Sequence, residues 1–314
     1  HTLNEYAAQM ATGMEARAES LQIAIHIIAG AHVIDCGISV PGGIQAGLAL
    51  ARICMAGRGE VTLVPSMIPD LHLPALQVTS DDPIHACMAS QYAGWQISVG
   101  KYFAMGSGPM RAAYGQEALF DHLPGREKSP VAVGILETKK LPTKEVISYL
   151  CEKLAVTPDR LILLCAPASS LAGTIQVVAR SLETALHKLH ELGFDLKKIV
   201  SGYGIAPIPP VSNDEIAAIG RTNDAILYGG EVHLWIQAED SELLDIGPKV
   251  PSMSSRDHGK PFAKIFSYYG NDFYKVDPHL FSPAVVTFCN LKTGRRLVFG
   301  KIDKAVLRQS FGEN

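Results

Sequence analysis

The stretch LILLCAPASSLAGTIQVVARSLETALHKLHELG, residues 161 to 193, joins a strand pattern to a helix pattern. LILLCAPA is a continuous apolar run with the length of a buried strand. From Thr174 to Leu192 apolar residues recur at spacings of three and four, which predicts one long amphipathic helix ended by Gly193. Its core-facing positions are Val178, Leu182, Ala185, Leu189 and Leu192. A buried strand followed by a helix across a short loop indicates an α/β fold.

The rest of the chain repeats this alternation. We expect helices within residues 4–23, 43–57, 81–95 and 141–156 and around 261–270, strands within 32–43, 61–68, 95–99, 131–137 and 232–238, and a final hairpin over 284–302. The loop PGREKSP, residues 124–130, suits a domain boundary because it combines prolines, a glycine and charges. The sequence therefore predicts a mixed α/β fold with two α/β domains, 1–128 and 129–314. The C-terminal hairpin is also compatible with a return to the first domain.

The composition excludes several classes of protein. The 314 residues are 47% hydrophobic and 19% charged, with a formal net charge of -3 and no basic stripe, so we expect no nucleic-acid partner. No apolar stretch has the length of a membrane span and no charged-then-apolar leader opens the chain, so we expect no membrane partner and a cytoplasmic protein. The six cysteines contain no C-x-x-C pair and are expected to be buried, reduced thiols.

The helix in the opening stretch has a polar edge. Arg180, Glu183, His187 and His190 follow one another at spacings of 3, 4 and 3, which would align them on one face. One interpretation is a solvated edge with a weak ion pair. A second is a metal site of Glu183, His187 and His190, although their order is not H-E-x-x-H. A third makes Glu183 a general base in a cleft, oriented by Arg180. Spacing alone leaves all three open.

A glycine-containing turn and a charged loop are candidate anion sites. Gly106, Ser107 and Gly108 precede a helix pattern, so their backbone N–H groups, with the charge of Arg111, are suited to hold a phosphate or carboxylate; a tight structural turn explains them as well. The loop SSRDHGKPF, residues 254–262, is unusually rich in charge. Its candidates are Arg256 and Lys260.

Four further residues are suited to recognise a flat ring. Tyr92 and Trp95 fall three apart on an expected helix and would either pack in the core or stack on a ligand. Asn223 and Asp224 would hydrogen-bond the edge of a heterocycle, or Asp224 would cap a helix.

Seven strings, taken together and in order, resemble one known family. They are VIDCGISVPGG, SQYAGWQISVGKYFAMGSGPMRA, VVARSLETALHKLHELGFD, VSGYGIAPIPP, RTNDAILYGG, SSRDHGKPF and DFYKVDPHLFSPAVV. From about Ile34 to Phe311 the chain resembles methenyltetrahydromethanopterin cyclohydrolase, and most closely its bacterial branch, which serves formaldehyde oxidation in methylotrophs. It departs from the archaeal members at Tyr92, where they carry a lysine.

The resemblance implies hydrolysis of the methenyl bridge between N5 and N10 of tetrahydromethanopterin to the N5-formyl compound, a step of one-carbon metabolism. It implies no metal, nucleotide or redox cofactor, a pocket between two α/β domains, and a homotrimer. The family's Arg-x-x-Glu pair falls on Arg180 and Glu183.

On this basis we expect Glu183 to activate the attacking water and Arg180 to position it. The anionic tail of the pterin would be held by residues of the two candidate anion sites, and its ring by Tyr92, Trp95, Asn223 or Asp224. The alternatives are a metal-dependent amidohydrolase using Glu183, His187 and His190, and a non-catalytic pterin-binding protein. A tetrahydrofolate cyclohydrolase is disfavoured because no dinucleotide-binding fingerprint is present.

Overall fold

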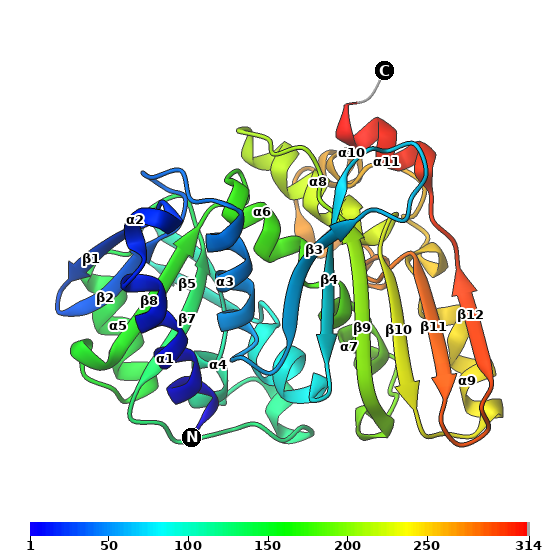
Figure 1. Cartoon of the computed structure of the whole chain (residues 1–314), viewed down its shortest axis with the longest axis horizontal. Helices are drawn as coiled ribbons and strands as arrows, with labels where there is room; N and C mark the ends of the chain where they lie inside the picture. The colour runs from blue at the N-terminus through cyan, green and yellow to red at the C-terminus, as the bar shows by residue number, and fades with distance from the viewer. Residues whose placement is uncertain (313–314) are drawn as a thin grey trace. The chain divides into compact units, whose positions relative to one another are not determined.

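The structure, a computed structural model, describes residues 1–312, and the chain forms two compact units, each built from two segments (Figure 1). The first unit consists of His1–Gly59 and Ile84–Gln176. The second consists of Glu60–Pro83 and the chain from Val177 onward. The expected boundary at residue 128 lies inside the first unit, so the division differs from the one that the sequence suggested.

Two sets of contacts account for this difference. Glu127, in the middle of the PGREKSP loop, accepts hydrogen bonds from the N–H groups of Leu3 and Asn4 at 2.9 and 3.0 Å, so the loop is fixed to the start of the chain. The strands that follow the loop pair with strands that precede it. The strand expected at 61–68 belongs to the second unit, because it forms a hairpin whose other strand pairs with residues 202–207.

The first unit is a six-stranded sheet covered by helices on both faces. The strand order is β1-β2-β8-β7-β6-β5, with bounds β1 (Ala24–Ile28), β2 (Ala31–Asp35), β5 (Trp95–Val99), β6 (Tyr102–Ser107), β7 (Ala132–Glu137) and β8 (Leu161–Ala166). The helices are α1 (Leu3–Glu15), α2 (Ala18–Leu21), α3 (Ile44–Cys54), a π-helix (Ile84–Gln91), α4 (Met110–Tyr114) and α5 (Lys144–Leu154), and α6 (Leu171–Val178) leads into the second unit. β2, β8 and β7 run parallel.

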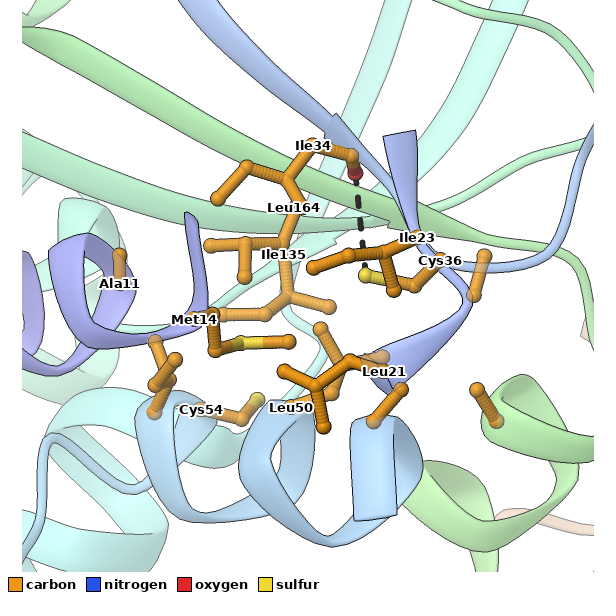
Figure 2. Packing of buried hydrophobic residues seen from close by; sticks show 14 of the residues in the cluster. Ala11, Met14, Leu21, Ile23, Ile34, Cys36, Leu50, Cys54, Ile135 and Leu164 are labelled. Atoms are coloured by element: carbon orange, nitrogen blue, oxygen red, sulfur yellow. Dashed lines mark hydrogen bonds between the residues drawn. The ribbon is translucent and has the colours of Figure 1, made fainter. Parts of the chain in front are cut away.

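Alternate residues of the central strands point into two separate cores. In the first core Figure 2 shows Ala11 and Met14 of α1 and Leu50 and Cys54 of α3 packed with Ile34, Ile135 and Leu164 of the sheet. The second core contains Val33, Leu163 and Leu136 with the buried face of α5. Because both faces of these strands are buried, LILLCA reads as an unbroken apolar run.

The second unit contains another six-stranded sheet, which includes the C-terminal hairpin. The strand order is β12-β11-β10-β9-β4-β3, with bounds β3 (Glu60–Pro65), β4 (Pro74–Ser80), β9 (Ile199–Pro207), β10 (Glu231–Ile236), β11 (Val285–Asn290) and β12 (Arg296–Gly300). Its helices are α7 (Ser181–Glu191), α8 (Glu215–Leu227), α9 (Asp240–Ile246), α10 (Phe262–Tyr268) and α11 (Lys304–Phe311). α7 packs on β9, β10 and β4.

The expected α/β fold with two α/β parts is confirmed, with one change of helix type. In the segment 81–95 the helix is a π-helix that ends at Gln91, and the N–H of Tyr92 bonds to the carbonyl of Cys87 at 2.8 Å. Trp95 therefore begins β5 instead of sharing a helical edge with Tyr92.

Within residues 1–312, no helix has both the length and the apolar character needed to cross a membrane. The cysteines are free thiols: four are buried, whereas Cys151 and Cys289 are partly exposed.

Candidate active site

The helix expected as one element over residues 174–192 is interrupted at Arg180. α6 ends at Val178 and α7 begins at Ser181, with Arg180 as the N-cap residue of α7 at φ -90° and ψ 9°. The carbonyl of Arg180 accepts both the N–H and the hydroxyl of Thr184, each at 2.8 Å. The expectation of one continuous helix, with Arg180 on a shared face, is therefore wrong; no glycine or proline marks the interruption in the sequence.

Glu183 lies in the first turn of α7. The unpaired backbone N–H groups at the start of a helix carry partial positive charge and stabilise a carboxylate there. Glu183 is only 6% exposed and Arg180 only 8% exposed, so neither residue belongs to a solvated edge. The interpretation of Arg180 and Glu183 as a solvated edge with a weak ion pair is therefore excluded. Burying two ionisable side chains costs free energy, so their burial needs another explanation.

Glycines of β9 set the position of the first turn of α7. A Cβ atom on Gly204 would lie 2.4 Å from Oγ of Ser181, and one on Gly202 would lie 2.5 Å from Cδ1 of Leu182. Any larger side chain at these positions would push the helix away from the strand. The SGYG string is thus part of a strand, and its glycines hold the turn that carries Glu183 against the sheet.

The histidines of α7 do not complete a metal site with Glu183. Nε2 of His187 lies 3.6 Å from Oε1 of Glu191, one turn further along the helix. Among residues 1–312 no group of three or more His, Cys, Asp or Glu side chains has a metal-binding arrangement. The geometry thus offers no support for the interpretation of Glu183, His187 and His190 as ligands.

A lysine that was not among the predicted site residues is buried in the same helix. Lys188 is 1% exposed, and its ammonium group donates to the carbonyl of His279 and to Oγ of Ser254 at 3.3 Å. Burial lowers the pKa of Lys188 to about 8, although nearby Asp277 acts to raise it. The sequence signal that could have indicated this burial is the position of Lys188 three residues after Ala185, next to the apolar stripe of the helix.

The charged loop 254–262 is exposed at Arg256 and Lys260 but firmly anchored between them. The hydroxyl of Tyr228, a fully buried residue, donates to the carbonyl of Lys260 at 2.5 Å and accepts from the N–H of Gly259 at 3.1 Å. Asp257 accepts from the hydroxyl of Tyr269 at 2.7 Å. The two basic side chains therefore extend from a fixed backbone.

Asn223 and Asp224 make contacts inside the second unit. Nδ2 of Asn223 donates to the carbonyl of Ile219 at 2.8 Å. α8 begins at Glu215 with Asp214 as its N-cap, so Asp224 does not cap this helix. The carboxylate of Asp224 instead accepts the N–H of Phe262 at 2.9 Å and so caps α10. These contacts give both residues structural roles.

The two aromatic residues of the first unit that were expected to stack on a ligand ring, Tyr92 and Trp95, have different environments. Trp95 is buried and stacks on Tyr114, with ring centroids 4.2 Å apart and an angle of 6° between the planes. Tyr92 is partly exposed, and Cζ of Arg111 lies over its ring, 5.1 Å from the ring centroid. Trp95 is therefore a core residue, whereas Tyr92 keeps part of its surface accessible.

The candidate anion site at residues 106–111 is buried. Arg111 is fully buried, and its Nε and Nη2 donate to the carboxylate of Glu117 at 2.9 and 2.8 Å. Its Nη1 donates to the carbonyls of Met88 and Ser90, each at 3.1 Å. Gly106, Ser107 and Gly108 are buried too. These contacts support a structural turn, in which Arg111 neutralises Glu117.

A loop at the carboxyl edge of the first sheet was not singled out as a site. Asp35, at the end of β2, accepts the N–H groups of Gly37, Ile38 and Ser39 at 2.9, 2.7 and 2.9 Å. Burial acts to raise the pKa of Asp35, but these bonds and one from the Ser39 hydroxyl lower it overall. A Cβ on Gly37 would lie 2.6 Å from Oγ of Ser170, so this loop lies close against the start of α6.

Comparisons with known proteins agree on one family. The family model described as Cyclohydrolase (MCH) matches residues 2–311. A methenyltetrahydromethanopterin cyclohydrolase of Rhodopirellula baltica is 49% identical, over 91% of this chain and 87% of its own length. Proteins of the same name from Methylobacillus flagellatus and Methanococcoides burtonii are 45% and 42% identical, each over 90% of this chain and over 86% and 89% of their own lengths.

Proposed function

Because the chain belongs to the methenyltetrahydromethanopterin cyclohydrolase family, we propose that Glu183 activates water in its reaction and that Arg180 positions Glu183. The enzyme hydrolyses the methenyl bridge between N5 and N10 of the reduced pterin to the N5-formyl compound, a reversible step of one-carbon metabolism. The observation that supports the residue assignment is the burial of Arg180 and Glu183 together at the start of α7.

The chemistry needs little more than one carboxylate. The methenyl carbon is part of an amidinium-like cation and is already electrophilic. Glu183 accepts a proton from water as the water oxygen bonds to that carbon, which neutralises the cation. The same proton then passes to N10, the C–N10 bond breaks, and the remaining hydroxyl proton is released as the formyl carbonyl forms. One water is consumed and one proton is set free.

The surroundings of Glu183 suit this role. Glu183 lies in the first turn of α7, where the backbone N–H groups carry partial positive charge that suits a carboxylate. Because the water attacks a cation, the carboxylate charge of Glu183 also attracts the substrate to the site of the reaction. A fixed, charged carboxylate is therefore more useful here than a strongly basic one.

For the substrate's anionic tail we propose Arg256 and Lys260, which are exposed on an anchored loop. Tyr92 keeps part of its surface accessible, and we propose that it hydrogen-bonds to the pterin ring or stacks on it. We further infer a homotrimer working in the cytoplasm without a metal or other cofactor. Light scattering of the purified protein and elemental analysis test the oligomeric state and the metal content.

The decisive experiment follows the decay of methenyl absorbance with the wild-type protein, Glu183→Gln and Glu191→Gln, each with and without a chelator. Glu191 lies on the same helix with 56% of its side chain exposed and serves as a matched control. We expect Glu183→Gln to lower kcat by roughly 10²-fold to 10⁴-fold with little change in KM, and Glu191→Gln to behave as wild type. Wild-type turnover in Glu183→Gln would refute the assignment.

Two other outcomes would point elsewhere. Loss of wild-type activity with the chelator, restored by a divalent metal, would favour a metal-dependent amidohydrolase. Tight pterin binding by the wild-type protein with unchanged methenyl absorbance would mean a pterin-binding protein without this activity.

A further inference from the structure

Lys188 extends from α7 to two loops distant in the sequence. It donates to Ser254 and to the carbonyl of His279, 66 and 91 residues away. Lysine is almost never fully buried unless its charge has partners, so a 1% exposed lysine on the helix that carries Glu183 calls for an explanation. Hydrophobic side chains would fill the same space at lower cost in desolvation.

The charge of Lys188 is complemented by Asp277. Burial lowers the pKa of Lys188, and the field of Asp277 opposes that shift. Asp277 also caps the short helix Pro278–Leu280 by accepting the N–H of His279, whose carbonyl bonds to Lys188. The ammonium group therefore binds the backbone of this short helix at its middle residue and lies in the field of the carboxylate at its start.

Asp277 in turn holds the residues on both sides of Arg256. Its carboxylate accepts the hydroxyl of Ser255 at 2.7 Å, and its own N–H donates to Oδ2 of Asp257 at 2.7 Å. Arg256, between these two residues, is exposed. The backbone that presents the Arg256 guanidinium is thus fixed to Asp277 from both sides.

We propose that Lys188 is a positioning residue for Arg256: it fixes the segment around Asp277, and through it the Arg256 loop, to the helix that carries Glu183. This inference rests on the proposed function, in which Arg256 binds the anionic tail of the substrate. Its effect is to set the spacing, within the second unit, between the group that binds the tail and the carboxylate that activates water at the methenyl carbon.

A double-mutant cycle tests the proposal. The variants are Lys188→Met, Arg256→Gln, the double variant, and Lys198→Met as a control, since Lys198 is a partly exposed lysine paired with Glu242 at 2.8 Å. We expect Lys188→Met and Arg256→Gln each to raise KM about tenfold with kcat within about twofold, as for loss of one charge-assisted contact. The double variant should be no worse than Arg256→Gln alone, and Lys198→Met should match wild type.

The readouts distinguish positioning from a general loss of structure. Additive effects in the double variant, or a fall in kcat with KM unchanged, would overturn the proposal, as would a wild-type KM in Arg256→Gln. If Lys188→Met fails to fold, Asp277→Asn decides, because Asp277 is partly exposed and should give the same KM increase without additivity. The cycle is measured with Glu183 intact, so failure of the Glu183 assignment shows only in the Glu183→Gln assay.

Discussion

A Cβ atom on Gly204 would lie 2.4 Å from Oγ of Ser181 and 3.1 Å from the backbone nitrogen of Leu182. This close approach places the start of α7, and with it Glu183, directly over β9. An alanine at position 204 would force the Ser181 hydroxyl to shift and would also press on the main chain of the helix at Leu182.

Gly204→Ala should therefore destabilise the second unit by about 1–3 kcal/mol and lower kcat by displacing Glu183. The matched control is Gly13→Ala in α1, where nothing lies within 4 Å of the added Cβ. That change should stabilise the protein by up to about 1 kcal/mol because alanine favours helix. Urea unfolding measures the stability of each variant, and kcat measures the displacement of Glu183. Equal stabilities of the two variants would contradict the packing argument.

Ser181 itself should tolerate loss of its hydroxyl. Its Oγ is fully buried and has no hydrogen-bond partner among residues 1–312. Because an unsatisfied buried hydroxyl costs about 1–3 kcal/mol, Ser181→Ala should be neutral or stabilising in urea unfolding. It should also soften the effect of Gly204→Ala in the double variant. A loss of kcat in Ser181→Ala without loss of stability would instead mean that this hydroxyl contacts substrate or its water.

The sequence was informative wherever the decisive signal is local. LILLCA reads as a buried strand and Lys144–Leu154 as an amphipathic helix because each pattern depends on neighbouring residues. The division into units was not readable, since it depends on β4 pairing with β9, more than a hundred residues later. A loop with prolines and charges marks an exposed connection, and Glu127 shows that such a loop can still be held inside one unit.

The site shows the same limit. The spacing of Arg180 and Glu183, with the family resemblance, identified the candidate pair, and their burial removes the solvated-edge interpretation. The break before α7 has no glycine or proline signal, so it could not be predicted. The burial of Lys188 could not be predicted, because its hydrogen-bond partners lie in loops far along the chain. Long-range contacts decide burial, and a single sequence does not display them.

Arg111 should behave as a structural residue and not as an anion site. Arg111→Met leaves Glu117 and two backbone carbonyls without their donor, so we expect a loss of about 3 kcal/mol or more in urea unfolding. The matched control is Arg126→Met, because the pair of Arg126 with Asp121 is exposed and 3.5 Å long and should contribute below about 0.5 kcal/mol. A raised KM with full stability in Arg111→Met would restore the substrate-binding interpretation.

Asp224 should make stability fall as the pH rises from about 4 to about 7. Burial raises the pKa of this carboxyl to about 7, whereas the unfolded chain has the ordinary value of about 4. Between these values the folded state binds the extra proton, so deprotonation opposes folding by at most about 1.4 kcal/mol per pH unit. The stability that the neutral carboxyl contributes is complete below pH 4 and lost as the pH passes 7.

Asp224→Asn mimics the neutral carboxyl, which still accepts from Phe262 and reaches Ser310. The stability of this variant relative to wild type should therefore rise from pH 4 to pH 7 and then level off. Asp240→Asn is the control, because hydrogen bonds from Asn290 and Thr293 lower the pKa of Asp240 and the difference should stay flat above pH 5. Thermal unfolding of the three proteins at intervals from pH 4 to 8 measures this; a flat difference for Asp224→Asn would mean that Asp224 is ionised throughout, with the α10 N-terminus stabilising its charge.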